Sequence, residues 1–202
     1  MDSEARPGAR RFAARRPSAA DPMPESGVPI QKRSESVDTK DNLKDAFAGE
    51  SQANRKYLAY AKKAEADGFP QVARLFRAAA EAETVHAHAH LRALGGVQST
   101  EENLKDAIAG EGFEFKEMYP PYVATAEGEG DKRAAISFKN ALAVEETHHG
   151  LYSEALKAVQ AGRDLPAQKI HVCTICGHTH YGDAPDHCPV CNATVDRFLE
   201  ID

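Results

Sequence analysis

Residues 83–86 read ETVH, and residues 145–148 read EETH. In each stretch a glutamate and a histidine stand three positions apart, so both side chains project from the same face of a helix. Two further segments each carry a glutamate directly after a glycine, at Glu50 and Glu111. Two helices that supply one acid each, with two that supply a Glu-x-x-His pair, form the ligand set of a two-metal carboxylate site.

The acids lie inside apolar stripes that repeat with the helical period. The first stripe comprises Leu43, Phe47, Glu50, Asn54 and Tyr57, and a later one comprises Leu104, Ile108, Glu111, Phe115 and Met118. A buried carboxylate without a partner costs several kcal/mol or becomes neutral. Several such acids would cancel a net stability of only ~5–15 kcal/mol, so we expect two divalent cations to neutralise them. Carboxylates combined with imidazoles suit iron or manganese.

An internal repeat connects these helices. Residues 41–51 read DNLKDAFAGES and residues 102–112 read ENLKDAIAGEG, which is identical at eight of eleven positions. Packing alone would preserve only the apolar positions of such a repeat, yet the acids are preserved too. Two copies of a helix hairpin therefore predict a mainly α protein, a ferritin-like four-helix bundle with approximate two-fold symmetry about its metals.

Capping residues and helix breakers set the expected boundaries. Asp38 or Thr39 caps the first helix, and Ser99 opens the third with a capping box. The third helix should bend or break at Pro120 and Pro121, because each proline removes a backbone donor. The helices are expected over residues 39–66, 70–94, 99 to that break, and 131–161.

All four cysteines lie near the C-terminus, in two Cys-x-x-Cys pairs of identical spacing. Each pair predicts a metal-binding knuckle, and Gly177 permits the tight turn of the first knuckle. Short strands are expected near residues 169–172 and 197–201. Four thiolates form a tetrahedral site, and the spacing alone favours zinc over iron. A β module of about 35 residues has too small a core to fold without its metal. The expected thiolate ligands are Cys173, Cys176, Cys188 and Cys191.

Composition limits the possible functions. The 202 residues accommodate one ordinary domain and a small second one, and no apolar run is long enough to cross a membrane. Residues 1–40 carry eight Lys or Arg against six Asp or Glu, so the rest of the chain has a charge of −8 and no expected nucleic-acid face. Clustered cysteines indicate metal binding in a reducing compartment, and we expect a cytoplasmic protein.

The first 38 residues show no hydrophobic period and are rich in Arg, Ala, Pro and Ser. Their arginines suggest a targeting peptide, but Asp2, Glu4 and Asp21 do not suit one and an apolar segment is missing. We therefore expect a disordered tail over residues 1–38. Met23 remains an alternative start.

Taken together, these motifs resemble the rubrerythrin family. The resemblance covers about residues 40–202 and includes AGES around Glu50, ETVH at 83–86, GEGFE ending at Glu114 with EMYP shortly after, EETH at 145–148, and the cysteine module. It implies a ferritin-like di-iron bundle over residues 39–163 and a rubredoxin-like domain over residues 168–202. It also implies that the four cysteines hold iron rather than zinc.

The resemblance further implies roles for individual residues. Glu114 is an additional ligand, and one iron moves between the positions of His86 and Glu114 as the redox state changes. Tyr57 and Tyr119 match tyrosines that form hydrogen bonds with the ligating glutamates. The overlapping pair Glu146 and His149 is an alternative to Glu145 and His148, and the resemblance favours the latter pair. The implied di-iron ligands are Glu50, Glu83, His86, Glu111, Glu114, Glu145 and His148, and the catalytic candidates are Glu114, Tyr57 and Tyr119.

The implied activity is that of an oxidoreductase, a peroxidase that reduces hydrogen peroxide to water in defence against oxidative stress. Electrons would pass through the four-cysteine iron from a rubredoxin or an NAD(P)H-linked reductase. The linker after Gly162 is short beside a long helix, so we expect a homodimer in which this iron serves the neighbouring subunit. The alternatives are a ferroxidase or iron-storage protein, and a structural protein with a zinc knuckle.

Overall fold

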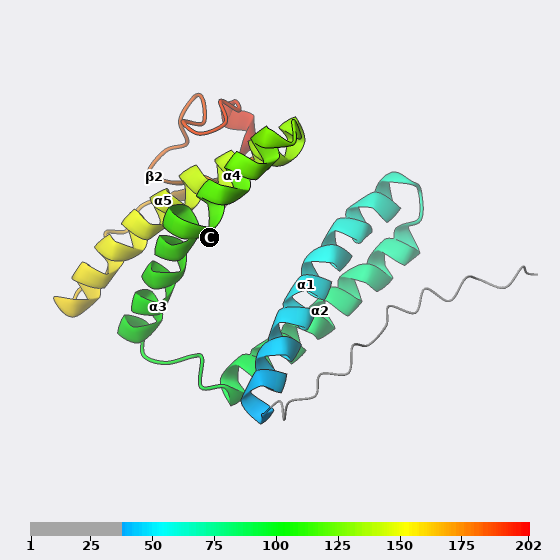
Figure 1. Ribbon diagram of the computed structural model, residues 1–202, viewed down its shortest axis with the longest axis horizontal. Coiled ribbons are helices and arrows are strands. Elements are labelled where there is room, and N and C mark those ends of the chain that lie inside the picture. The colour runs from blue at the N-terminus through cyan, green and yellow to red at the C-terminus, as the bar shows by residue number, and fades with distance from the viewer. Residues whose placement is uncertain (1–37) are drawn as a thin grey trace, which may run out of the picture. The chain divides into compact units, whose positions relative to one another are not determined.

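The computed structural model describes residues 38–202, so the tail expected over residues 1–38 lies, apart from Asp38, outside the described residues. The helices are α1 (Thr39–Ala66), α2 (Pro70–Ala93), α3 (Thr100–Phe113), the π-helix η1 (Glu114–Met118), α4 (Tyr119–Gly128) and α5 (Lys132–Gln160) (Figure 1). They are followed by β1 (Ile170–Cys173), β2 (Thr179–Tyr181), the 3₁₀-helix η2 (Val195–Arg197) and β3 (Phe198–Ile201). The predicted fold class, a mainly helical chain with a small C-terminal β module, is confirmed.

Side-chain caps fix the starts of the helices as the sequence indicated. The Asp38 carboxylate accepts a hydrogen bond of 2.9 Å from the backbone N–H of Asp41 at the start of α1. The Ser99 hydroxyl accepts one of 3.2 Å from the N–H of Glu102 at the start of α3. Both bonds satisfy donors that have no partner within the first turn of a helix.

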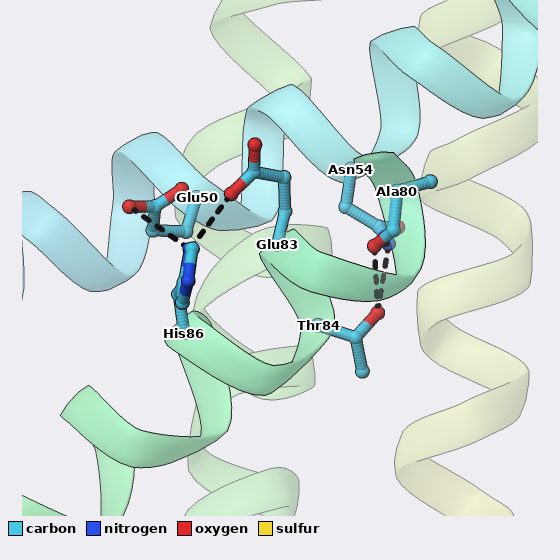
Figure 2. Close-up of polar contacts among 6 residues, drawn as sticks. All are labelled: Glu50, Asn54, Ala80, Glu83, Thr84 and His86. Carbon is cyan, nitrogen blue, oxygen red and sulfur yellow. Dashed lines mark hydrogen bonds and ion pairs between the residues drawn. The ribbon is translucent and has the colours of Figure 1, made fainter. Parts of the chain in front are cut away.

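The long helices pack in pairs. In Figure 1, α1 runs beside α2, and their contact surface contains the buried alanines Ala61, Ala73 and Ala80, whose small side chains let the two backbones approach closely. The amide of Asn54 on α1 donates to the carbonyl of Ala80 (2.7 Å) and to the hydroxyl of Thr84 (2.9 Å) on α2 (Figure 2). Separately, α3, η1 and α4 pack against α5. Within residues 38–202, extensive packing is found inside these two groups and not between them.

The chain does not break at Pro120 and Pro121. Both prolines lie in the first turn of α4, where missing N–H groups cost little. The preceding residues widen into the π-helix η1, in which the N–H of Tyr119 donates to the carbonyl of Glu114. This wider turn lets the backbone pass from α3 into α4 without a loop, and such π segments are frequent at functional sites. The expected break is therefore absent, and a change of helix type lies at the position where the bend was predicted.

The C-terminal sheet is antiparallel and has the strand order β2-β1-β3. His171 of β1 pairs with His180 of β2 and with Glu200 of β3. Two strands lie where the sequence predicted them, whereas β2 was not expected because it is only three residues long. This strand also contacts α5, which brings the module to the helical part of the chain. Among the described helices, none is long and apolar enough to cross a membrane.

Candidate metal centres

The first cluster of metal-ligating side chains lies between α1 and α2. Glu50 points from α1 toward Glu83 and His86 of α2, as Figure 2 shows, and one ligand atom of each lies within 4.8 Å of the others. The Nδ1 atom of His86 is 3.0 Å from Oε2 of Glu83 and 3.9 Å from Oε1 of Glu50. We call these three residues the first triad.

The second cluster repeats this geometry on α3 and α5. Glu111 of α3 faces Glu145 and His148 of α5, again with ligand atoms within 4.8 Å of one another. The Nδ1 atom of His148 is 2.9 Å from Oε2 of Glu145 and 3.7 Å from Oε1 of Glu111. We call this set the second triad. Each triad offers two carboxylates and one imidazole, a donor set that suits iron.

Glu50 and Glu83 of the first triad and Glu111 of the second have shifted pKa values. In the first triad, hydrogen bonding between the two carboxyl groups raises the pKa of Glu50 and lowers that of Glu83. In the second triad, burial raises the pKa of Glu111, and the charge of Glu145 raises it further. The hydrogen bonds from Glu50 and His86 favour the ionised form of Glu83, whereas burial and a neighbouring carboxylate disfavour the ionised form of Glu111. A bound cation would favour the ionised carboxylates in both triads.

Glu114 and Tyr119 accompany the second triad. Burial raises the pKa of Glu114, with a further contribution from the charge of Glu111. Burial also raises the pKa of Tyr119, whose ring is close enough to be affected by Glu114. Both tyrosines lie among aromatic rings: Tyr57 is 6.1 Å from Phe76 and Tyr119 is 6.2 Å from Phe138, measured between ring centroids. Among residues 38–202 the hydrogen bonds include none from the hydroxyl of Tyr57 or Tyr119 to a glutamate, so that role stays a prediction.

The overlapping Glu-x-x-His pair has a packing role. The imidazole of His149 stacks edge-to-face on the ring of Phe115 with 5.3 Å between centroids, which joins α5 to η1. A Cβ atom on Gly112 would contact the His149 ring at 3.4 Å, so α3 passes close to this imidazole. Glu146 is exposed and lies outside the clusters found among the described residues. The structure thus brings Glu145 and His148, rather than the alternative pair, to Glu111.

The four cysteines form the third cluster. Their sulfur atoms lie within 4.8 Å of one another, with Cys173 3.7 Å from Cys191 and Cys176 3.5 Å from Cys188. A tetrahedral metal with bonds of about 2.3 Å to sulfur separates its ligands by about 3.8 Å, so the spacing fits such a metal. These sulfur–sulfur distances are much too long for a disulfide bond, which is about 2.05 Å long. Cys173 and Cys188 are buried, and burial raises the pKa of the Cys176 thiol.

Two matched turns build this cluster. Gly177 follows Cys176 with φ +90°, and Asn192 follows Cys191 with φ +60°. The N–H of Gly177 donates to the carbonyl of Cys173 (2.8 Å), and that of Asn192 donates to the carbonyl of Cys188 (2.9 Å). The predicted need for glycine at residue 177 is therefore confirmed. Asn192 was overlooked, although asparagine is one of the few side chains that tolerate this backbone conformation.

The cysteine module is joined directly to the second triad. The Oγ1 atom of Thr179, on β2, lies 3.0 Å from Nε2 of His148. Cys173 is tied to the same segment, because its N–H donates to the carbonyl of His178 at 2.9 Å. His178 itself is buried, and both of its ring nitrogens lack a hydrogen-bond partner within the described residues. Burial lowers its pKa, so this side chain fills the contact as a neutral ring.

This contact differs from the expectation that the module serves a neighbouring subunit. Nine residues, 161–169, separate α5 from β1. In extended form they span roughly 30 Å, whereas His148 lies only about 18 Å along the helix from Gln160. The connection is therefore long enough for the module to fold back along α5 of its own chain. Thr179 was not singled out from the sequence, since a threonine in a three-residue strand carries no distinguishing pattern.

Both the helical part of the chain and its cysteine module match known protein families. Residues 41–156 match the rubrerythrin family model, and residues 171–199 match the model of the rubrerythrin rubredoxin-like domain. The chain is 33% identical to rubrerythrin-2 of Clostridium acetobutylicum, in an alignment that covers 79% of this chain and 95% of that protein. It is 34% identical to nigerythrin of Nitratidesulfovibrio vulgaris, over 79% and 85% of the two chains. A solved structure of nigerythrin in a mixed-valence state aligns with a TM-score of 0.48 and 32% identity, over 86% and 91% of the two chains.

Proposed function

Because the chain belongs to the rubrerythrin family, an oxidoreductase family of peroxidase type, we propose that it reduces hydrogen peroxide to water. The overall reaction consumes one peroxide, two electrons and two protons and releases two molecules of water. The observation that carries this proposal is the hydrogen bond between Thr179 and His148, which joins a four-thiolate site to a carboxylate-imidazole triad. A protein that only stored iron would have no use for an electron-transfer module at that position.

The donor sets fit the family's metals. The thiolates of Cys173, Cys176, Cys188 and Cys191 would hold one iron, and the carboxylate-imidazole site would hold two. The proposed ligands of that site are the clustered Glu50, Glu83, His86, Glu111, Glu145 and His148. The resemblance adds Glu114 as a further proposed ligand. When bound, the iron ions supply the electrons that cleave the oxygen–oxygen bond. The domain limits we propose remain residues 39–163 and 168–202, with the tail before them.

The side chains around the carboxylate-imidazole site would donate a proton and hydrogen bonds to the bound peroxide. Glu114 retains a proton more readily than an ordinary glutamate because of burial and of the charge on Glu111. Its carboxyl group could deliver that proton to a peroxide oxygen bound beside the second triad. Tyr119, whose raised pKa keeps its hydroxyl protonated, would donate a hydrogen bond in the same place. We propose an equivalent role for Tyr57 next to the first triad.

Electrons would enter through the cysteine module. From Cys173, one hydrogen bond leads to the carbonyl of His178, and the adjacent Thr179 bonds to the imidazole of His148. This covalent and hydrogen-bonded route connects the two kinds of site within one chain. A rubredoxin or an NAD(P)H-linked reductase would supply the electrons from outside. We also propose a homodimer in the cytoplasm, where the reducing environment keeps the four thiols available for metal.

Rapid mixing of the fully reduced protein with hydrogen peroxide, and separately with dioxygen, tests the reaction. We expect peroxide to oxidise the protein much faster than dioxygen does. A clear preference for dioxygen would favour the other candidate, a ferroxidase or iron-storage protein. If the absorption spectrum of native protein lacked the red colour of ferric tetrathiolate, the cysteine module would hold zinc and the electron route would be excluded.

A further inference from the structure

We propose that two pairs of tyrosines conduct oxidising equivalents from the carboxylate-imidazole site to the protein surface when the supply of electrons fails. The pairs are Tyr57 with Tyr60 on α1, and Tyr119 with Tyr122 on α4. Each pair would let a tyrosyl radical leave the site, so that the metal ligands are not oxidised in its place. The inference rests on the proposed function, because hydrogen peroxide is the oxidant.

The first pair belongs to a cluster of three aromatic rings between α1 and α2. Measured between centroids, the ring of Tyr60 lies 6.4 Å from that of Tyr57 and 5.6 Å from that of Phe76. Tyr57 and Phe76 are 6.1 Å apart, so each ring is a direct neighbour of the other two. Rings that are this close allow an electron to move between them in one short step. We call these three residues the first aromatic cluster.

The second pair forms an equivalent cluster between α4 and α5. The ring of Tyr122 lies 6.2 Å from that of Tyr119 and 5.6 Å from that of Phe138. Tyr119 and Phe138 are 6.2 Å apart. Each distance is close to its counterpart in the first aromatic cluster, so both helix hairpins carry the same arrangement. We call this set the second aromatic cluster.

Both clusters lie close to the metal-ligating glutamates. Tyr57 follows Glu50 by seven residues, and Phe76 precedes Glu83 by seven. Seven residues are close to two helical turns and span roughly 10 Å, so each ring lies on the same side of its helix as the glutamate. In the second hairpin, burial and the charges of the neighbouring acids raise the pKa of Tyr119, which places its ring beside the second triad.

The π-helix η1 keeps the second aromatic cluster in register. The glutamates Glu50 and Glu111 are 61 positions apart in the internal repeat. The tyrosines Tyr57 and Tyr119 are 62 positions apart. The second hairpin thus has one extra residue between its glutamate and its tyrosines, in the stretch that contains η1. A π-helical turn accommodates an additional residue within a helix, so the insertion does not displace the tyrosine pair.

The repeat retains the tyrosines although it changes their apolar neighbours. With the offset of 62 positions, Leu58 corresponds to Pro120 and Leu75 corresponds to Ser137. Both tyrosines and the phenylalanine of the first aromatic cluster recur unchanged in the second. Phenylalanine rings in place of the tyrosines would fill the same space and pack equally well. The recurrence of both hydroxyl groups therefore points to their chemistry, because a phenol loses an electron and a proton far more easily than a benzene ring does.

The outer tyrosine of each cluster is open to solvent. Tyr60 is 48% and Tyr122 is 45% exposed, whereas Tyr57 and Tyr119 are partly buried. A radical that reaches the outer ring is accessible to a soluble one-electron reductant, such as ascorbate. This reductant needs no access to the metal site, because a single ring-to-ring step connects the inner tyrosine with the exposed one.

The proposed steps balance in atoms, charge and electrons. Complete reduction of one peroxide takes two electrons and two protons. When only one electron and one proton are available at the site, the inner tyrosine supplies the other electron and its phenolic proton, which leaves two waters and a neutral tyrosyl radical. The outer tyrosine then passes one electron inward and releases a proton to water, while the inner oxygen takes up a proton. An electron and a proton from the soluble reductant restore the outer tyrosine.

Excess hydrogen peroxide in the absence of an electron donor tests the route. Full-length protein is loaded with iron, reduced, freed of reductant, and mixed with more peroxide than its stored electrons can consume. One sample is frozen for electron paramagnetic resonance, and a second contains a nitroso spin trap and is digested for mass spectrometry. We expect a tyrosyl radical signal and trap adducts on Tyr60 and Tyr122. Ascorbate added with the peroxide should prevent both.

Phenylalanine variants keep the rings and remove the hydroxyl groups. Tyr60→Phe should lose the adduct of the first hairpin alone, and Tyr122→Phe that of the second alone, so each variant is the internal control of the other. Both should keep wild-type peroxide turnover while an electron donor is in excess, and wild-type absorption of the four-cysteine iron shows that they are folded. Tyr152→Phe is the matched control. Tyr152 is 37% exposed and its ring lies 6.4 Å from that of His148, but it belongs to neither cluster, so the adducts should be unchanged.

The route and the proposed function fail in different ways. Adducts that form chiefly on Tyr152, or a total adduct yield that the Tyr60→Phe/Tyr122→Phe double variant does not lower, would overturn the route. Equal adduct yield in zinc-loaded protein would overturn it too, because peroxide in solution would then be the direct oxidant. If the iron-loaded protein consumes peroxide and no tyrosine is oxidised, only the route is refuted. If it does not consume peroxide, the proposed function fails and the route fails with it.

Discussion

Individual acids in the two triads have distinct tasks because their surroundings differ. Glu83 lies beside both Glu50 and His86, and its lowered pKa keeps it charged for metal binding. Glu114 lies at the start of η1 outside the second triad, and its pKa is raised by burial. Glu83 therefore suits cation binding alone, whereas Glu114, proposed above as a further ligand, can also carry a proton.

Replacing these two acids should separate metal binding from turnover. Glu83→Ala should abolish iron binding in the first triad, because one imidazole and one carboxylate remain. Glu114→Ala should retain the iron but slow peroxide turnover by about 10²-fold, the usual contribution of a positioned proton donor. Metal analysis and steady-state peroxide assays measure both effects, with the exposed Glu117→Ala as control. The reverse order of effects would contradict the role of Glu114.

A second prediction concerns the hydrogen bond between Thr179 and His148. Thr179→Val removes the hydrogen bond to His148 and keeps the shape of the side chain. We expect unchanged metal content, with oxidation of the four-cysteine iron after mixing with peroxide slowed about fivefold, the factor that corresponds to about 1 kcal/mol. Stopped-flow absorbance of the ferric thiolate site measures this rate. Thr174→Val, which removes a hydrogen bond to the carbonyl of Arg197 in the same module, should leave the rate unchanged.

Helix boundaries and helix pairing were predictable to different degrees. The caps at Asp38 and Ser99 were visible in the sequence because capping depends on a few adjacent residues. The π-helix η1 was not, since a proline pair indicates a break and nothing local specifies a wider turn instead. Asn54 was recognised as part of the α1 stripe, but its partners Ala80 and Thr84 lie on another helix. Contacts between elements depend on tertiary packing that a local pattern does not contain.

The Asn54 cross-link yields a prediction about the first helix pair. Asn54→Ala removes two hydrogen bonds and leaves the partly buried Thr84 hydroxyl with only its bond to the carbonyl of Ala80. The free energy of unfolding should fall by about 1–3 kcal/mol. Chemical denaturation followed by circular dichroism measures the loss. Asn42→Ala, at an exposed position of the same helix, should change the stability by less than about 0.5 kcal/mol.

At the scale of the whole molecule, the sequence predicted which residues cluster and did not predict where the clusters meet. The repeat at residues 41–51 and 102–112 correctly indicated two equivalent halves, and the cysteine spacing indicated a metal module. The repeat also predicted the two helix hairpins, but neither pattern contained the packing of β2 on α5 or the lack of extensive packing between the two hairpins within residues 38–202. Those depend on linker length and on the surfaces that each element leaves free, which single motifs do not encode.

Removal of metal from the cysteine module should act on both parts of the molecule. The module has a small core, and structural metals in such domains supply on the order of 10 kcal/mol of folding free energy. Chelation, or the variant Cys188→Ser, should therefore abolish hydrogen-exchange protection in β1, β2 and β3. Protection around His148 should fall too, because Thr179 no longer covers it. Protection of α1 and α2 should persist, and its loss would show that the chain unfolds as one unit.

Under the proposed function, the unequal exposure of the two histidines would give the oxidant and the reductant separate entrances. Thr179 covers Nε2 of His148 on the side from which the proposed route would deliver electrons, and the His148 side chain is only 24% exposed. His86 stands open by comparison, and we expect peroxide to arrive from that direction. Separate approach paths would keep peroxide away from the cysteine thiolates, which it would otherwise oxidise.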